Sequence, residues 1–194
     1  MNLLTEEEGK YAVDAAVSFV LEAVTGKKAA YSMPPAVFSE PRGVFVTLNS
    51  SGALRGCIGY PYPSIPLINA LKDAAYQAAC ADPRFYPVGA NELETLDIEV
   101  TVLAPPKTLE VPAHERPNRI EIGKHGLIAE YRGYRGLLLP QVAVEWEWNA
   151  EEFLDQTCIK AGLPPKTWES ETCTIQTFEG QIFTRTKPWQ LHLK

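Results

Sequence analysis

The sequence predicts an α+β fold, and two patterns support that prediction. In three segments the apolar residues recur at the three- and four-residue spacing of a helix, whereas several shorter segments have the alternation and the flanking turns of strands. Helices of this kind bury an apolar stripe against a sheet, so we expect a two-layer α+β arrangement. A chain of 194 residues is long enough for one domain or for two small subdomains.

The first helix is expected to begin directly after Thr5. Thr5 and Glu8 have the spacing of a capping box, in which a hydroxyl and a carboxylate satisfy the free backbone N–H groups at a helix start. Apolar residues follow at helical spacing over 12–24, and Gly26 supplies a C-terminal stop. The apolar face of this helix is predicted to enter the core.

A β-hairpin and a second helix are predicted next. Two strand-like segments, 44–48 and 53–60, flank the turn sequence Asn-Ser-Ser-Gly. Prolines then prevent further strand pairing, and a helical pattern covers 67–79 before it ends near Asp82-Pro83.

The second half of the chain is predicted to hold short strands and one more helix. Residues 97–103 alternate in the manner of a half-buried strand. Further strands are expected at 120–122, 126–131, 136–139 and 172–178. Asn149 with Glu152 predicts the start of a third helix, which ends at Gly162 and places Cys158 among its core positions.

Composition and charge restrict the class of protein. The chain has 24 acidic and 18 basic residues, a formal charge of −6, and this composition argues against a broadly basic surface for nucleic acid. The first residues, MNLLTEEEGK, lack the basic and apolar regions of an export signal, and no apolar segment is long enough to span a membrane. Four scattered cysteines without metal-ligand spacing suggest reduced thiols, and we expect a cytoplasmic protein.

The string LRGCIG, residues 54–59, is the most distinctive candidate for a site. Arg55 and Cys57 share strand parity, so their side chains are expected on one face about 6–7 Å apart, where the guanidinium would favour a thiolate. Gly56 and Gly59 imply a bulge or the close approach of a ligand or of another backbone. The alternative is a buried, inert cysteine beside an arginine that neutralises a buried carboxylate.

Three further residues are candidates. Asp82 and Arg84 flank a proline after the second helix, and they form either a self-contained cap and ion pair or a site in which Arg84 faces an anionic ligand. Glu99, on the polar side of its strand, is placed to accept a proton or to orient a base, but a solvated position or a structural pair with Arg55 is also open.

His125 is the histidine considered as a partner of Cys57 in a nucleophilic dyad, although their proximity is not visible in the sequence. No spacing typical of a zinc site, an EF-hand or a phosphate-binding loop is present, so no metal and no cofactor are predicted. The segment 131–136, Tyr-Arg-Gly-Tyr-Arg-Gly, is a basic and aromatic turn that is either solvated or contacts RNA or a protein partner.

LRGCIGY resembles the signature of the AMMECR family. The strings DPRFYPV, IEVTVLAPP, IEIGKHGLI, GLLLPQVAVE and FLDQTCIKAGLPPKTW are similar to the family's other blocks and occur in the family's order. The resemblance covers nearly the whole chain, and the ending TRTKPWQLHLK departs from it.

The resemblance implies a single domain over 1–194 with two unequal subdomains, each built on an antiparallel sheet. The larger would contain both termini and the LRGCIG strand, and the smaller would be inserted into it. The resemblance also implies partners, because prokaryotic relatives are often encoded beside, or fused to, a Memo-like protein and a radical-SAM protein, as component A of the AmmeMemoRadiSam system.

These observations leave three hypotheses. In the first, Cys57 and Arg55 lie in a cleft between subdomains that binds an unknown small molecule, Cys57 is the nucleophile or acceptor, and Glu99 or His125 transfers protons. In the second, the protein is a non-catalytic adaptor that docks a partner through the glycine-rich strand or the turn at 131–135. The third, a nucleic-acid-associated role, is the least compatible with the acidic composition.

Overall fold

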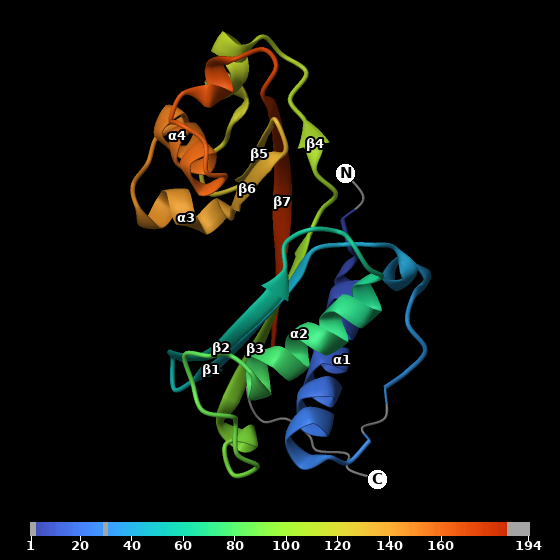
Figure 1. The fold of residues 1–194 in the computed structure, drawn as a ribbon. Helices are drawn as coiled ribbons and strands as arrows, with labels where there is room; N and C mark the ends of the chain where they lie inside the picture. The colour runs from blue at the N-terminus through green and yellow to red at the C-terminus, as the bar shows by residue number, and fades with distance from the viewer. Residues whose placement is uncertain (1–2, 29–30, 186–194) are drawn as a thin grey trace. The chain divides into compact units, whose positions relative to one another are not determined.

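The computed structural model describes residues 3–28 and 31–185, and it confirms the α+β class (Figure 1). The chain divides into two compact units. Unit 1 comprises Met1–Leu103 with Gln181–Lys194, and unit 2 comprises Ala104–Gly180. The predicted aperiodic tail, 186–194, lies outside the described residues. Within the described ranges, no helix combines the length and the hydropathy required to cross a membrane.

Helix α1 (Glu6–Thr25) begins and ends where the sequence predicts. The Thr5 hydroxyl accepts a hydrogen bond from the Glu8 N–H, and the Glu8 carboxylate accepts one from the Thr5 N–H. Gly26 ends the helix in the left-handed conformation, with φ of 69°. The buried face of the helix is apolar and includes Phe19 and Val20, so α1 supplies one wall of the core of unit 1.

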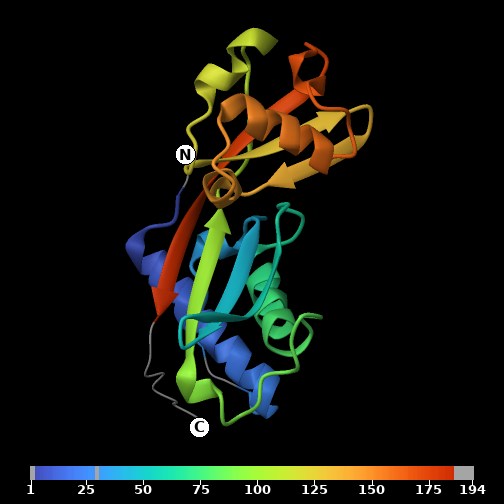
Figure 2. The same cartoon turned by 90° about the vertical axis from the view of Figure 1, so that its left-hand side faces the viewer.

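The sheet of unit 1 contains β1 (Val44–Ser50), β2 (Ala53–Tyr60) and β3 (Leu96–Leu103), all antiparallel, in the order β2-β1-β3. Helices α1 and α2 (Leu67–Cys80) cover one face of it (Figure 2). Alternate residues of β1 (Val44, Val46 and Leu48) are fully buried beneath them. The predicted hairpin is confirmed, and β2 is left at the edge of the sheet.

Gly56 is required by the packing of β2 against α2. A Cβ atom at this position would lie 2.1 Å from the carbonyl oxygen of Ala78 in α2, a distance at which the backbone of one element must move. The sequence left a bulge, a ligand or another backbone as explanations for this glycine. The structure shows the close approach of another backbone, that of α2.

The strands of unit 2 are antiparallel as well. Strands β5 (His125–Tyr131) and β6 (Tyr134–Leu138) form a hairpin, β5 also pairs with β7 (Thr174–Arg185), and the short β4 (Lys107–Thr108) pairs with β7. Helix α4 (Ala150–Lys160) starts at the predicted capping box of Asn149 and Glu152. Its buried residues form the core with side chains of β5 and β7, namely Phe153, Leu154, Cys158, Leu127 and Ile175.

Some short elements differ from the sequence-based prediction. The prediction of a strand at 120–122 was wrong. These residues follow the 3-10 helix η3 (Ala113–Arg119) and form a turn that leads into β5, in which the Glu121 carbonyl accepts a hydrogen bond from the His125 N–H. Helix α3 (Pro140–Glu145) was not predicted, because Pro140 was treated only as an interruption although proline suits the first turn of a helix. The remaining 3-10 helices are η1 (Ala36–Ser39), η2 (Leu93–Thr95) and η4 (Thr167–Glu169).

Strand β7 continues beyond the predicted end at 178, and its last residues belong to unit 1. There the Gln181 side chain exchanges two hydrogen bonds with the backbone of Leu4, and Arg185 pairs with Asp14. The N-terminal segment and the end of β7 are thus joined within unit 1.

We predict that Gly56→Ala destabilises the protein by about 1–3 kcal/mol, because the new methyl group must displace the backbone of α2. Chemical denaturation of the two proteins measures the difference. Gly89→Ala is the matched control, since the added Cβ there comes close only to the flexible end of the Asn91 side chain and meets the Glu92 carboxylate at ordinary contact distance. Its effect should stay within about 0.5 kcal/mol. Equal effects of the two substitutions would contradict the packing role of Gly56.

Candidate functional site

Cys57 lies on the sheet face opposite to α1 and α2, in a row of three polar side chains. In the strand register Cys57 of β2 faces Thr47 of β1, and Thr47 faces Glu99 of β3. Residues directly opposite one another project from the same face of a sheet, and all three are half-buried. The Thr47 hydroxyl donates a hydrogen bond to the Cys57 sulfur at 3.2 Å. We call these residues the thiol row.

The backbone of Cys57 is held from the free edge of β2. Its N–H donates to Asp82 Oδ2 at 2.9 Å, and its carbonyl accepts from Arg84 Nη2 at 2.9 Å. Because both groups point away from β1, Cys57 and Thr47 form a non-hydrogen-bonded pair, the type in which opposite side chains lie closer together. The loop after α2 therefore protects the edge strand and fixes the position of the thiol.

The Asp82 carboxylate is the centre of this clamp. It is buried, and it accepts hydrogen bonds from Arg84 N, Nε and Nη2 as well as from the Cys57 N–H. The Arg84 side chain holds the pKa of Asp82 well below its usual range, and the two backbone N–H groups act in the same direction against the effect of burial. The Asp82 side chain is thus an ionised, fully engaged structural group, whereas Arg84 remains about half exposed.

Arg55 pairs with a residue that the sequence did not select. Its Nε and Nη2 donate to the two oxygens of Glu92, at 2.8 and 3.0 Å, and its Nη1 donates to the Tyr86 carbonyl. These hydrogen bonds with Glu92 raise the pKa of Arg55 and lower that of Glu92. The guanidinium is therefore engaged by a carboxylate and by backbone carbonyls.

A register shift gives Arg55 this environment. Leu48 pairs with Gly56 but Asn49 pairs with Leu54, so Arg55 is the extra residue of a β-bulge and has no partner across the strand pair. The same shift places Thr47 opposite Cys57, because an unbroken register from the turn would put Thr47 opposite Gly56. Strand alternation suggests Thr47 as a polar residue of β1, but only the bulge identifies it as the neighbour of the thiol.

The remaining candidates have separate surroundings. His125 belongs to unit 2, where its Nδ1 accepts a hydrogen bond from the Glu121 N–H and its Nε2 lies 4.0 Å from Glu179 Oε1. Gly59 faces Phe45 of β1, and a Cβ at Gly59 would lie 2.3 Å from the Val44 carbonyl oxygen. In the part of the chain that the structure describes, no three His, Cys, Asp or Glu side chains are grouped so as to hold a metal ion.

Comparisons with known proteins cover almost the whole chain. The family model described as AMMECR1 matches residues 11–183. A protein of Methanocella arvoryzae is 49% identical over 96% of this chain and 95% of its own length, and Protein MJ0810 of Methanocaldococcus jannaschii is 48% identical over 97% and 95%. The crystal structure of the uncharacterized protein PH0010 from Pyrococcus horikoshii is similar with a TM-score of 0.78 and 45% identity, covering 95% of each chain.

We predict that Asp82→Asn lowers the free energy of unfolding at neutral pH by about 2 kcal/mol, since a buried acceptor loses its charge while its donors remain. The folded-state pKa of Asp82 is depressed, so its contribution is complete above the ordinary aspartate pKa of about 3.9 and is lost as the pH falls below that value. Denaturation of wild type and variant across this range should show the two stabilities converging in acid.

Asp14→Asn is the control for this experiment. Asp14 pairs with Arg185, but its side chain is 46% exposed, so its removal should cost about 1 kcal/mol or less. A stability gap between wild type and Asp82→Asn that is unchanged in acid would show that the Asp82 charge is not what holds the loop to β2.

Proposed function

The chain belongs to the AMMECR1 family, and on that basis, together with the geometry of the thiol row, we propose that it acts through Cys57 as a nucleophile or acceptor for an electrophilic group of a small molecule. The single observation that carries the proposal is the hydrogen bond from the Thr47 hydroxyl to the Cys57 sulfur, on the sheet face away from the core. Cys158 and Cys173 are fully buried in unit 2, so Cys57 is the better placed thiol.

The Thr47 hydrogen bond fixes the position of the sulfur. The hydroxyl holds Cys57 Sγ at 3.2 Å, and a nucleophile that is held in one orientation loses less freedom when it attacks. In this proposal Thr47 is the neighbour of the thiol that the sequence expected Arg55 to be, since the Arg55 guanidinium is occupied by Glu92. Arg55 then serves as a positioning residue that holds the bulge beside Cys57.

Glu99 is proposed as the proton acceptor. It lies opposite Thr47 in the neighbouring strand, so its carboxylate belongs to the same row of side chains as the thiol whose proton it would accept. The Cys57 sulfur then forms a bond to the electrophilic carbon of the substrate, while the leaving group departs with the electron pair of the broken bond. The half-exposed Arg84 is available to an anionic group of the same substrate.

A Memo-like protein and a radical-SAM protein are proposed as the partners with which this site works. The support for them is the family membership, because these are the proteins that the resemblance associates with the chain. The small-molecule substrate is proposed only by class, as a compound with an electrophilic carbon.

We predict that iodoacetamide alkylates Cys57 faster than any of the other three cysteines at neutral pH. Mass spectrometry of tryptic peptides measures the four rates separately. Cys80 is the matched comparison, since it is also half-buried but burial alone raises its pKa. Thr47→Val should slow alkylation of Cys57 about fivefold, which corresponds to the loss of one hydrogen bond of about 1 kcal/mol. An alkylation rate at Cys57 no greater than that at Cys80 would contradict the proposal that Cys57 is the nucleophile.

A second candidate function, that of an adaptor, is supported by the turn between β5 and β6. Tyr134 is 59% exposed there, and Arg132 lies over the ring of Tyr131 with 5.0 Å between the guanidinium carbon and the ring centroid. Arg132 and Gly133 adopt left-handed backbone conformations, so a tight turn leads directly into the exposed Tyr134. Exposed aromatic and arginine side chains of this kind are common anchors at protein interfaces.

The two candidate functions are separated by a pair of substitutions. If the protein is an adaptor, Tyr134→Ala should weaken binding to a Memo-like protein of the same organism about tenfold, and Cys57→Ala should leave it unchanged. If the thiol is the functional group, Cys57→Ala abolishes turnover in the reconstituted mixture while binding persists. Isothermal titration of the purified partners gives the binding constants. If neither variant loses binding or turnover, both candidate functions are excluded.

A further inference from the structure

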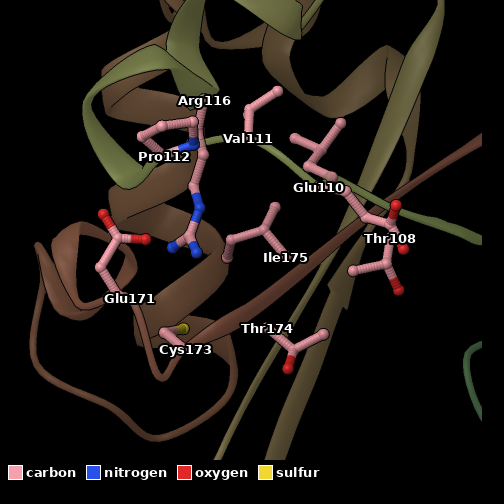
Figure 3. A pocket seen from close by; sticks show the side chains of 10 residues that line it. Thr108, Glu110, Val111, Pro112, Arg116, Glu171, Cys173, Thr174 and Ile175 are labelled. Atoms are coloured by element: carbon pink, nitrogen blue, oxygen red, sulfur yellow. The ribbon is translucent and has the colours of Figure 1, made fainter.

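Unit 2 contains a pocket of about 430 Å³ that takes no part in the proposed thiol chemistry (Figure 3). Its walls come from the segment between β4 and η3 and from the start of β7. The lining residues that matter are Val111, Arg116, Glu171, Cys173 and Ile175. The walls therefore combine apolar side chains with a single cationic group.

Arg116 is a buried cation whose charge is not matched by a carboxylate. The residue is only 4% exposed, and no described acidic side chain lies within the 4.0 Å of an ion pair. Its Nη1 donates to the carbonyls of Trp168 and Ser170, the latter at 3.1 Å, while its buried Nε has no hydrogen-bond partner among the described residues. A buried charge in this state is costly unless an anion compensates it.

Arg55 is a second partly buried arginine of the chain, and its guanidinium has a carboxylate as its hydrogen-bond partner. The Nε and Nη2 of Arg55 together bind the two oxygens of the Glu92 carboxylate. In Arg116 the carbonyls of Trp168 and Ser170 fix Nη1, and the Nε edge is the one left without a partner. Figure 3 shows the Arg116 side chain extending among the lining residues toward Glu171 and Cys173. A carboxylate is the group that typically completes such a guanidinium edge, through two parallel hydrogen bonds.

We propose that this pocket binds a small organic monocarboxylate, with its carboxylate against the guanidinium of Arg116 and its apolar part against Val111 and Ile175. The acidic side chains of Glu110 and Glu171 also line the pocket and are exposed, so they disfavour a multiply charged anion such as phosphate. The Glu171 carboxylate is already held in place, because it accepts a hydrogen bond from the Ala113 N–H.

Cys173 is the group within the protein that would compete with an external carboxylate to neutralise Arg116. A hydrogen bond with Cys158 lowers the pKa of Cys173, and the nearby Arg116 acts in the same direction while burial opposes both. A Cys173 thiolate would itself neutralise the guanidinium and leave no role for an external carboxylate. The thiolate absorbs in the ultraviolet, so comparison of wild type with Cys173→Ala at neutral pH tests this directly. A thiolate signal that the substitution removes would overturn the proposal.

The binding test uses isovalerate, its neutral analogue isovaleramide, and inorganic phosphate, added to isotope-labelled full-length protein and followed by heteronuclear NMR. We expect isovalerate to shift the amide signals of Ala113, Glu171 and Thr174, and isovaleramide and phosphate to bind about tenfold more weakly or not at all. Equal responses to isovalerate and phosphate, or none to isovalerate, would overturn the proposal.

Three variants keep the test decisive if one protein folds poorly. Arg116→Lys retains the charge but loses the planar fork, and it should weaken isovalerate binding about tenfold. Val111→Trp fills the pocket while leaving Arg116 in the sequence, and it should abolish binding, whereas Val144→Trp, at an exposed valine of unit 2 outside the pocket, should leave binding unchanged. Binding that survives Val111→Trp would place the carboxylate elsewhere and overturn the assignment.

Discussion

The buried carboxylate of Asp82 is the interaction on which the arrangement of unit 1 depends. Four hydrogen bonds converge on it, from the backbone N–H groups of Cys57 and Arg84 and from the Arg84 side chain. Arg84 in turn binds the Cys57 carbonyl, so the loop after α2 closes the free edge of β2 at one residue. The close contact between Gly56 and Ala78 fixes the same strand from the helix side. Together these two constraints present the Cys57 side chain on the opposite face of the sheet.

The charges of the two units are balanced in different ways. In unit 1 both arginines near the LRGCIG strand have a carboxylate partner, Glu92 for Arg55 and Asp82 for Arg84. In the proposed reaction, bond formation and proton transfer at this strand therefore fall to the thiol row, and the exposed part of Arg84 is left only for binding. In unit 2 the buried Arg116 has carbonyl acceptors but no described carboxylate within ion-pair distance, and this difference is the ground for the carboxylate site proposed there.

The features that the sequence predicted well are local ones. The capping boxes at Thr5 and Asn149 and the hairpin of β1 and β2 depend on residues a few positions apart, and the structure has each of them. The pairing of Arg55 with Glu92 depends on residues 37 positions apart and on a one-residue bulge, neither of which leaves a periodic signal. Helix α3 was missed for a local reason, because Pro140 both interrupts a strand and begins a helix. The sequence thus selected Cys57, Asp82 and Arg84, but it did not select Thr47 or Glu92 or identify the contacts that these residues make.

Amide hydrogen exchange at Cys57 tests the central role of Asp82 most directly. The Cys57 N–H points away from β1 and has the Asp82 carboxylate as its acceptor, so its protection reports on that single contact. We expect the native protein to protect this amide as strongly as amides within the β1–β3 pairing, and Asp82→Asn to reduce the protection of Cys57 far more than theirs. A Cys57 amide that exchanges in the native protein at the rate of an unprotected amide would contradict the account.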